Sequence, residues 1–184
     1  DNVSSLWIFV GALYKTLYTL CTVTYLPLGN DQLILTYHRG ESPLRKTIAT
    51  KKYNEQGVAL VYPKDELAGG TWIGLSEKNR LVCLLNGGFE IHQSKEPYAM
   101  SRGLIVKKIL SAENSVAWIT NFIFENIEPF TLVLVDWANS LAIYELVWDG
   151  VTRHFTELDK VPKIWSSYTM YTTAMSASRR AWYA

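Results

Sequence analysis

The side chains best suited to chemistry are few and widely spaced. Two cysteines, Cys21 and Cys83, cannot build a disulfide framework, and neither belongs to a metal-binding spacing. Three histidines, His38, His92 and His154, are too scattered for a zinc motif, so we interpret them as surface or strand residues. We therefore expect no metal and no other cofactor. Read by itself, Cys21 is a small apolar residue of a buried strand.

Two glycine-containing loops could bring polar groups close to a ligand. The segment Gly69-Gly70-Thr71-Trp72 places two glycines before a predicted strand, which suits either a tight turn or a close approach of two backbones. A second predicted strand ends in Asn86, followed by two glycines, which is a turn signal. The Asn86 carboxamide is also a hydrogen-bond donor. A plain turn explains either loop, and neither identifies a reaction by itself.

Several familiar functional signatures are missing. The chain has no phosphate-binding Gly-Lys-Ser/Thr loop, no Gly-x-Gly-x-x-Gly and no Gly-x-Ser-x-Gly. The formal charge of +1 gives no net field that favours nucleic acid or an anionic membrane. Seven tryptophans lack interleaved basic residues, so we expect them in the core rather than on a base-stacking platform. These absences by themselves identify no reaction.

The elements that must position these residues are mostly strands. Period-two alternation and turn signals predict antiparallel strands, and period-3.6 patterns predict helices. In the first helix, Leu104, Ile105 and Ile109 share one face, with Lys107 and Lys108 turned away. Antiparallel strands with segregated helices indicate the α+β class. The expected strands are 21–28, 33–37, 57–62, 71–75, 81–85, 130–137, 141–148 and 152–155, and the expected helices are 101–112, 115–124 and one ending at 184.

Length and composition predict one globular domain. The chain has 184 residues, 48% of them hydrophobic and 19% charged. The apolar run at 6–13 is too short for a membrane span and lacks the positive flank of a signal peptide. We expect residues 1–20 to be a leader or a misassigned start outside the fold. Residues 21–184 would then form a single domain that is cut short at its C-terminus.

From Cys21 onward the sequence resembles the NRDE family, also called the transport and Golgi organisation 2 family. The resemblance covers nearly all of 21–184 in the family's order. The segments that carry it are Cys21-Thr-Val-Thr-Tyr-Leu-Pro27, Glu41-Ser-Pro-Leu-Arg-Lys-Thr47, Pro63-Lys-Asp-Glu-Leu-Ala-Gly-Gly-Thr-Trp-Ile-Gly74, Asn86-Gly-Gly-Phe89, Ser101-Arg-Gly103, Val135-Asp-Trp137, Tyr144-Glu-Leu-Val-Trp-Asp-Gly150 and Ile164-Trp-Ser-Ser167.

The resemblance implies an N-terminal nucleophile hydrolase-like αββα sandwich of antiparallel sheets. In such enzymes the first residue is the nucleophile and its own α-amine is the base. By that analogy Cys21 attacks an amide or acyl C–N bond of a small-molecule substrate, Arg39 favours the thiolate, and Asn86 donates to the oxyanion. The resemblance also assigns motif or cleft positions to His38, Glu41, Gly69, Gly70, Thr71, Trp72, Asp136, Trp165 and Ser166.

Two features depart from the family pattern. The motif Asn-Arg-Asp-Glu stands here as His38-Arg39-Gly40-Glu41, so a side-chain amide and a carboxylate are lost. Family members also open with Met-Cys, whereas 20 residues precede Cys21 here. With those residues attached, Cys21 has no free α-amine.

Two alternatives to hydrolysis remain open at this point. The family resemblance also fits a non-catalytic carrier of a hydrophobic ligand such as haem or an acyl-CoA. A protein with a vestigial site and an interaction role is the other alternative. Loops that resemble those of bacterial members suggest a cytoplasmic location.

Overall fold

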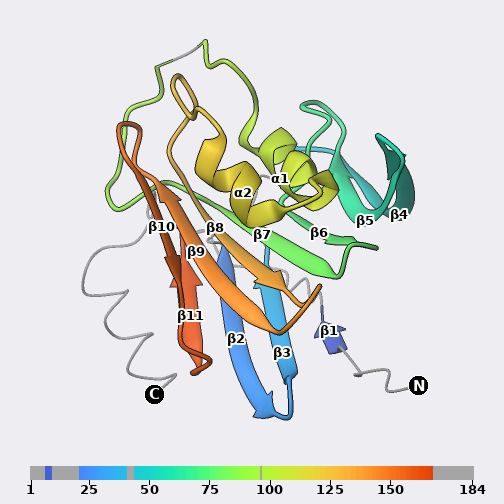
Figure 1. Cartoon of the computed structure of the whole chain (residues 1–184). Helices are drawn as coiled ribbons and strands as arrows, with labels where there is room; N and C mark the ends of the chain where they lie inside the picture. Colours follow the sequence, from blue (N-terminus) through green and yellow to red (C-terminus); the bar gives the residue numbers. More distant parts are fainter. Residues whose placement is uncertain (1–6, 10–20, 41–43, 96, 168–184) are drawn as a thin grey trace.

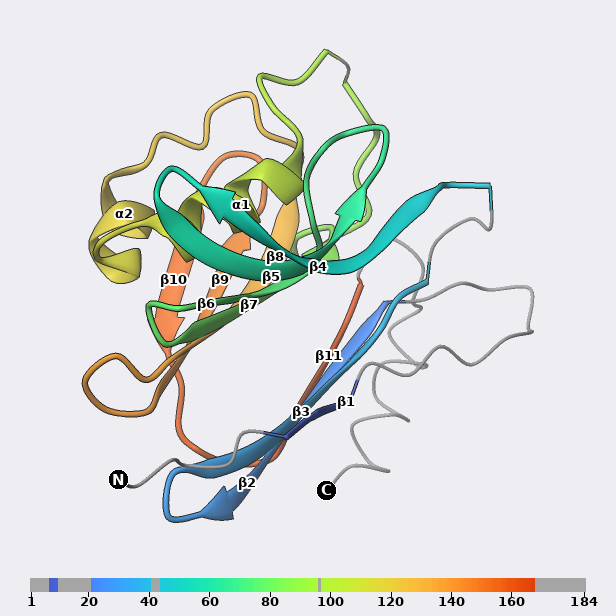
Figure 2. The same cartoon turned by 90° about the vertical axis from the view of Figure 1, so that its right-hand side faces the viewer.

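The computed structural model describes residues 7–9, 21–40, 44–95 and 97–167. The predictions for Glu41, for a C-terminal helix and for the fourth layer of the sandwich lie outside these residues. Within them, two β-sheets face each other, and two helices cover the outer face of the larger sheet (Figures 1 and 2). The predicted α+β class with stacked antiparallel sheets is confirmed.

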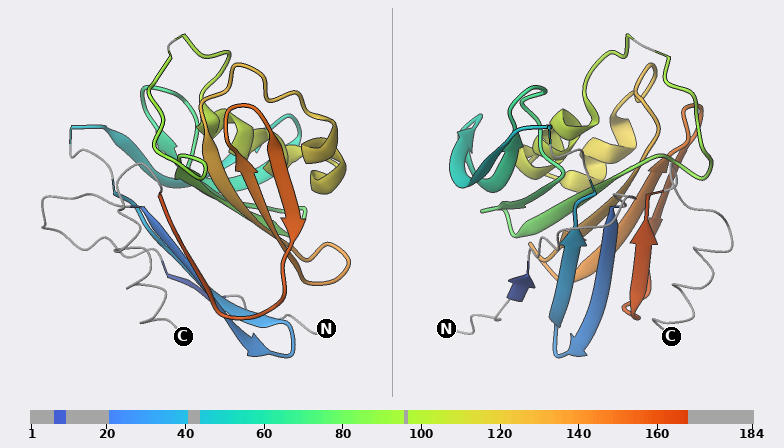
Figure 3. Two further views of the ribbon diagram at one scale, coloured as in Figure 1. Left: turned by 90° about the vertical axis from the view of Figure 1, so that its left-hand side faces the viewer. Right: turned by 180° about the vertical axis from the view of Figure 1, so that it is seen from behind.

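The smaller sheet has four strands in the order β1–β3–β2–β11. Strand β1 runs parallel to β3, and the other neighbours in this sheet are antiparallel. Because β2 pairs with β11, the strand that follows Cys21 lies beside the last described strand, and β1 lies at the opposite edge of this sheet (Figure 3). The strands are β1 (Trp7–Phe9), β2 (Thr22–Gly29), β3 (Gln32–His38) and β11 (Lys163–Ser166).

The larger sheet has seven antiparallel strands in the order β10–β9–β8–β7–β6–β5–β4. The helices α1 (Arg102–Ser111) and α2 (Ser115–Asn121) lie on its outer face (Figure 1). The strands are β4 (Thr47–Glu55), β5 (Val58–Asp65), β6 (Ile73–Ser76), β7 (Arg80–Asn86), β8 (Phe130–Asp136), β9 (Ala142–Trp148) and β10 (Arg153–Glu157).

Alternation in the sequence explains the two cores. In the β2–β3 hairpin, alternate side chains are buried against the larger sheet, namely Val23 and Tyr25 on β2 and Leu33, Leu35 and Tyr37 on β3. Strands β7 and β8 are buried on both faces, because one face meets this hairpin and the other meets the helices. The hairpin turns at Gly29, Asn30 and Asp31, all with positive φ, as the Gly-Asn-Asp signal predicts.

Helix α1 packs differently from its predicted face. Its buried residues are Ile105, Val106, Ile109 and Leu110, whereas Leu104 is only half-buried. The prediction that Lys107 turns away was wrong. The curled β4–β5 end offers a carboxylate beside the helix, and Lys107 Nζ lies 2.6 Å from Glu55 Oε1.

The remaining differences concern edges and ends. Helix α2 ends at Asn121, so the Ile123 side chain is exposed rather than on the buried face. Strands β1, β4 and β11 were not predicted. Strand β1 lies within residues 1–20, which were expected outside the fold, yet Trp7–Phe9 pair with β3 in the smaller sheet. Strands β4 and β11 are edge strands with polar or charged residues at several positions, and edge strands need no apolar alternation on two faces.

Candidate active site

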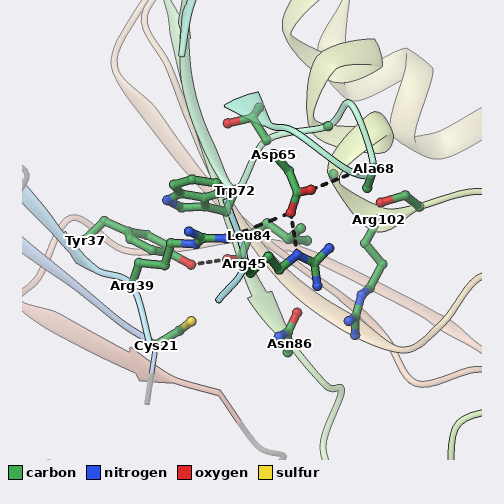
Figure 4. A pocket seen from close by; sticks show the side chains of 14 residues that line it. Cys21, Tyr37, Arg39, Arg45, Asp65, Ala68, Trp72, Leu84, Asn86 and Arg102 are labelled. Carbon is green, nitrogen blue, oxygen red and sulfur yellow. Dashed lines mark hydrogen bonds and ion pairs between the residues drawn. The ribbon is translucent and has the colours of Figure 1, made fainter. Parts of the chain in front are cut away.

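A small pocket of about 80 Å³ lies where one end of the smaller sheet meets the larger sheet and the start of α1 (Figure 4). Residues from six separate stretches of the chain form it, so only the folded chain assembles it. The lining residues are Cys21, Tyr37, Arg39, Arg45, Asp65, Ala68, Gly70, Thr71, Trp72, Leu84, Asn86, Ser101, Arg102 and Gly103.

Cys21 immediately precedes β2, and its side chain is 6% exposed. The Gly40 N–H donates a hydrogen bond to Cys21 Sγ at 3.4 Å, and the thiol lies 3.6 Å from the Gly40 carbonyl oxygen that can accept its proton. The Ser167 N–H donates to the Cys21 carbonyl at 3.1 Å, which ties the residue to the end of β11. The backbone of Gly40 therefore offers a partner to the thiolate and to the thiol.

Tyr37 lies beside Cys21 and joins the two sheets. Its hydroxyl donates a hydrogen bond to the Leu84 carbonyl on β7 at 2.7 Å. Burial, with a further contribution from the neighbouring Cys21 thiol, raises the pKa of Tyr37 well above its usual value. Tyr37 therefore stays a neutral phenol and holds the Cys21 end of the smaller sheet against β7.

Two arginines and one aspartate form the wall beside Tyr37. The Arg39 guanidinium lies over the Trp72 ring, 3.6 Å from its centroid, and Arg39 Nη1 donates to Thr47 Oγ1 at 2.7 Å. Arg39 Nη2 is 3.9 Å from Asp65 Oδ2, and Arg45 Nε donates to the same oxygen at 2.6 Å. Asp65 thus fixes the positions of both guanidinium groups.

Asp65 is buried, and backbone groups hold its carboxylate. Oδ1 accepts the N–H of Leu67 at 3.0 Å and the N–H of Ala68 at 2.9 Å. Burial acts to raise the pKa of Asp65, but the hydrogen bonds from Ala68 and Arg45 outweigh it and hold the pKa below its usual value. The residue is therefore a stable carboxylate at neutral pH.

The two glycines of the pocket loop have different roles: Gly69 forms a turn, and Gly70 lets the loop backbone approach the backbone of Gly103. Gly69 has a φ of +68°, which favours glycine. Gly70 packs on the start of α1, because a Cβ atom at this position would lie 2.5 Å from the Gly103 carbonyl carbon. The Thr71 N–H donates to the Gly103 carbonyl at 3.1 Å. This contact places the first residues of α1 at the pocket.

The opposite wall carries an arginine and an amide. Arg102 Nη1 donates to the Pro129 carbonyl at 3.0 Å, and Arg102 Nη2 pairs with Glu128 Oε2 at 2.9 Å. Asn86 is the last residue of β7, and its backbone pairs with Phe130. In the part of the chain that the structure describes, the Asn86 carboxamide makes no hydrogen bond, so it can serve a bound molecule.

The structure brings together several of the residues singled out from the sequence. Cys21, Arg39 and Asn86 line one pocket with Gly70, Thr71 and Trp72, and Gly69 belongs to the same loop. His38 is the last residue of β3, opposite Thr22, and is absent from the described lining. Their roles in a reaction remain predictions.

Three of the predicted cleft residues lie elsewhere. Asp136, at the far end of β8, accepts a hydrogen bond from Ser115 Oγ at 2.8 Å and pairs with Arg80. Trp165 is on β11 and donates to Glu145 Oε2 at 2.5 Å, which links the two sheets. Ser166 pairs with Thr22 in the ladder. These positions support the fold rather than the pocket.

Sequence reasoning did not single out eight of the described lining residues, among them Tyr37, Arg45, Asp65 and Arg102. Arg45, Asp65 and Arg102 stand inside the segments that carry the family resemblance, so charged residues of those segments were the available signal. Tyr37 had no such signal, because it fits the alternation of a buried strand. Among the described residues, no group of three or more His, Cys, Asp or Glu side chains could hold a metal ion.

Comparison with known proteins identifies the family. Residues 20–178 match the family described as Transport and Golgi organisation 2. The chain belongs to that family. No curated protein matches the sequence. A solved structure similar to this one is a variant of conjugated bile acid hydrolase from Clostridium perfringens, at 8% identity and a TM-score of 0.44. The match covers 90% of this chain and 50% of that structure, so the chain spans about half its length.

The stretch that departs from the expected family motif lies next to Cys21. Gly40, where the resemblance led us to expect an acidic side chain, presents only its backbone, and that backbone contacts Sγ. Arg39 lies 3.9 Å from the Asp65 carboxylate. No helix of the described residues is long and apolar enough to cross a membrane.

Proposed function

We propose that the protein is a cysteine amidohydrolase in which Cys21, once it carries a free α-amine, attacks the carbonyl of a small amide. One observation supports this most directly. Cys21, Arg39 and Asn86 are far apart in the sequence, yet a nucleophile, a cation and an unused amide donor line the same pocket. That combination is what acyl transfer from an amide requires.

The first step is the formation of an acyl-enzyme. The Cys21 α-amine, with an ordinary pKa of about 7.7–8.0, takes the thiol proton. Sγ then forms a bond to the substrate carbonyl carbon, and the carbonyl oxygen becomes an oxyanion that accepts a hydrogen bond from Asn86. When the C–N bond breaks, the departing nitrogen takes the proton held by the α-ammonium group. A thioester on Cys21 remains.

Hydrolysis of the thioester completes the cycle. The α-amine, again neutral, accepts a proton from water as the water oxygen attacks the thioester carbonyl carbon. The C–S bond breaks, the carboxylic acid leaves, and the proton returns to Sγ. During both steps the Gly40 N–H is in place to donate a hydrogen bond to Sγ, and the Arg39 guanidinium lines the same pocket as a positive charge.

The character of the pocket favours hydrolysis over transport of a hydrophobic ligand. Charged and polar side chains make up most of the described lining, and no histidine is among them. Haem or an acyl chain needs a large apolar cleft, whereas this pocket of about 80 Å³ is small and mostly polar. Binding of haem or an acyl-CoA is therefore the weaker alternative.

The test compares a chain that begins at Cys21 with the 1–184 chain, with Cys21→Ala as the matched control in each. Each folded protein is incubated with a panel of small N-acyl amides and N-acyl p-nitroanilides, and intact mass spectrometry detects acyl-thioesters. We expect the chain that begins at Cys21 to form the thioester and release amine. Cys21→Ala should lower the rate by roughly 10³-fold or more.

The 1–184 chain should be inactive, because its Cys21 nitrogen is an amide. The proposal is wrong if the chain that begins at Cys21, shown to be folded by circular dichroism, forms no acyl-enzyme. It is also wrong if the folded chain is alkylated no faster than the unfolded one.

A further inference from the structure

We infer that Thr131 is a positioning residue, which holds the Asn86 carboxamide in the direction from which it donates to an oxyanion on Cys21. The inference rests on the proposed function for the role of Asn86, and it extends the site to a residue outside the described lining. A hydrogen bond from the Thr131 side chain to the residue just beyond Asn86 carries the argument.

The chain that follows Asn86 needs an external constraint. Asn86 is the last residue of β7, and two glycines come after it. Gly87 has a φ of +85°, a conformation that glycine adopts without steric cost, but glycine adopts many others as readily. The Asn86 carboxamide makes no hydrogen bond within the part of the chain that the structure describes. Its direction is therefore set by the groups that fix the next two residues.

The start of β8 supplies those groups. The Gly87 N–H donates to the Pro129 carbonyl at 3.1 Å, and Thr131 Oγ1 donates to the Gly87 carbonyl at 3.0 Å. Gly88 then packs against the end of β9, where a Cβ atom would lie 3.0 Å from the Trp148 carbonyl oxygen. Both peptide groups that flank Gly87 are therefore held in place.

Of these contacts, the bond from Thr131 is the one that depends on a side chain. Thr131 is 2% exposed. Every second residue of β8 lies on the same face, and the next two on the face of Thr131 are the buried Val133 and Val135. A valine at position 131 would continue this apolar face with almost the same shape. The Thr131 hydroxyl is thus the group that distinguishes the position from its neighbours, and its acceptor is the Gly87 carbonyl.

Loss of the hydroxyl leaves the Gly87 carbonyl without its donor. A buried acceptor without a partner is costly, so we expect the turn to move until water or another donor reaches this carbonyl. Asn86 is joined directly to Gly87 and moves with it. Thr131→Val should therefore weaken any interaction that Asn86 makes with a bound oxyanion, whereas Thr131→Ser keeps the hydroxyl and should preserve it.

Reversible addition of an aldehyde to Cys21 measures that interaction without turnover. Sγ forms a bond to the aldehyde carbon of acetamidoacetaldehyde, the thiol proton passes to the oxygen, and the hemithioacetal oxygen takes the place of the oxyanion. The 1–184 chain is used, because a free N-terminal cysteine would close with an aldehyde to a thiazolidine. Titration with ¹³C-labelled aldehyde, followed by NMR, gives the dissociation constant, and Cys21→Ala identifies the signal of the adduct.

The decisive measurement is a double-mutant cycle. We expect Asn86→Ala to raise the dissociation constant about tenfold and Thr131→Val to raise it about threefold to tenfold, with Thr131→Ser within about twofold of the parent. If Thr131 acts through Asn86, Thr131→Val should change the constant by less than about twofold in the Asn86→Ala chain. An equal effect of Thr131→Val in both backgrounds would show a merely structural role and overturn the inference.

Thr120→Val is the matched control. Thr120 Oγ1 also donates to a backbone carbonyl, that of Val116 at 2.8 Å, but on α2 and away from the described lining. Its loss should leave the dissociation constant unchanged. Circular dichroism shows which variants fold. If Thr131→Val does not, Thr131→Ala takes its place in the cycle, because the smaller side chain leaves room for a water molecule at the Gly87 carbonyl.

The outcomes separate this inference from the proposed function. An effect of Thr131→Val that disappears in the Asn86→Ala chain supports the inference, whether or not any amide is hydrolysed. Acyl-enzyme formation together with an aldehyde affinity that Thr131→Val leaves unchanged keeps the enzyme and removes the role of Thr131. If the folded parent forms no hemithioacetal on Cys21, the inference is wrong, and the acyl-enzyme test decides the proposed function by itself.

Discussion

Helix α1 has an arginine–aspartate pair near each of its ends, and the two pairs have different surroundings. At the C-terminal end, the Arg80 side chain is 3% exposed and its Nε lies 3.3 Å from Asp136 Oδ2. Arg80 also donates to the carbonyls of Ile109, Ala112 and Glu113, which have no partners within the helix. This pair satisfies the last turn of α1 and joins it to the centre of the larger sheet.

Near the N-terminal end, the Arg45 side chain is 41% exposed, and its partner Asp65 is bound mainly by backbone N–H groups. This pair lies in the wall of a pocket rather than under a helix. The same two residue types therefore stabilise the fold where the arginine side chain is buried, and present charge to the pocket where it is exposed. Exposure and the identity of the other partners decide between the two roles.

The largest effect is expected from a substitution that breaks the buried Arg80–Asp136 pair. Arg80→Gln leaves the helix carbonyls and Asp136 without a cation, so we expect a loss of about 3 kcal/mol in the free energy of unfolding. Arg45→Gln, the matched change at the exposed Arg45–Asp65 pair, should lower the free energy of unfolding by less than about 1 kcal/mol. Urea denaturation of both variants measures the difference. Equal losses would show that the comparison is wrong.

A medium effect is expected at the contact between the pocket loop and α1. Gly70→Ala forces a Cβ atom against the Gly103 backbone, so we expect a loss of about 1–3 kcal/mol and a changed rate of Cys21 alkylation. Gly69→Ala is the control. It introduces strain of about 1 kcal/mol at a positive φ but meets only a distant Lys64 side-chain atom. Thermal unfolding and alkylation kinetics of the two variants should therefore diverge, and parallel behaviour would remove the role assigned to Gly70.

The smallest effect concerns acid stability. Because the pKa of Asp65 is lower in the folded chain than in the unfolded one, its ionised form stabilises the fold. This contribution is complete above the unfolded pKa, near pH 4, and is lost as pH falls through the lower folded pKa. Asp65→Asn should therefore lose stability at pH 6 and differ less from the parent at pH 3. Unfolding free energies measured across that range check the sign, and a gap that widens toward acid would contradict it.

The sequence predicted the strands with regular alternation and the loops with strong turn signals. Residues 33–37 alternate between apolar and polar because one face is buried, and residues 81–85 are apolar throughout because both faces are buried. The sequence pattern alone was therefore enough to locate these two strands. It missed strands β1, β4 and β11. An edge strand such as Thr47–Glu55 is mostly solvated and carries no apolar period, and the three residues of β1 are too few to show one. Lys107 was misjudged because its partner Glu55 is distant in sequence.

The sequence predicted only those pocket residues to which the family resemblance assigned a role. Cys21, Arg39 and Asn86 do line it together, but sequence gives no distance between them. Asp136 shared a family segment and was placed in the cleft, although it pairs with Arg80 at the far end of β8. Tyr37 looks like any buried strand residue, because only the folded chain brings its hydroxyl to the Leu84 carbonyl.

The pairing of β2 with β11 also means that the smaller sheet is completed late during synthesis of the protein. Thr24 pairs with Thr36 on one side and with Ile164 on the other, so the strand that follows Cys21 lacks its second neighbour until about 140 more residues have been made. At about 5–20 residues per second, that interval is roughly 7–28 s. The wall of the pocket that holds Cys21 is therefore the last to be completed on the ribosome. A nascent chain exposes this thiol well before it can hold an amide beside it.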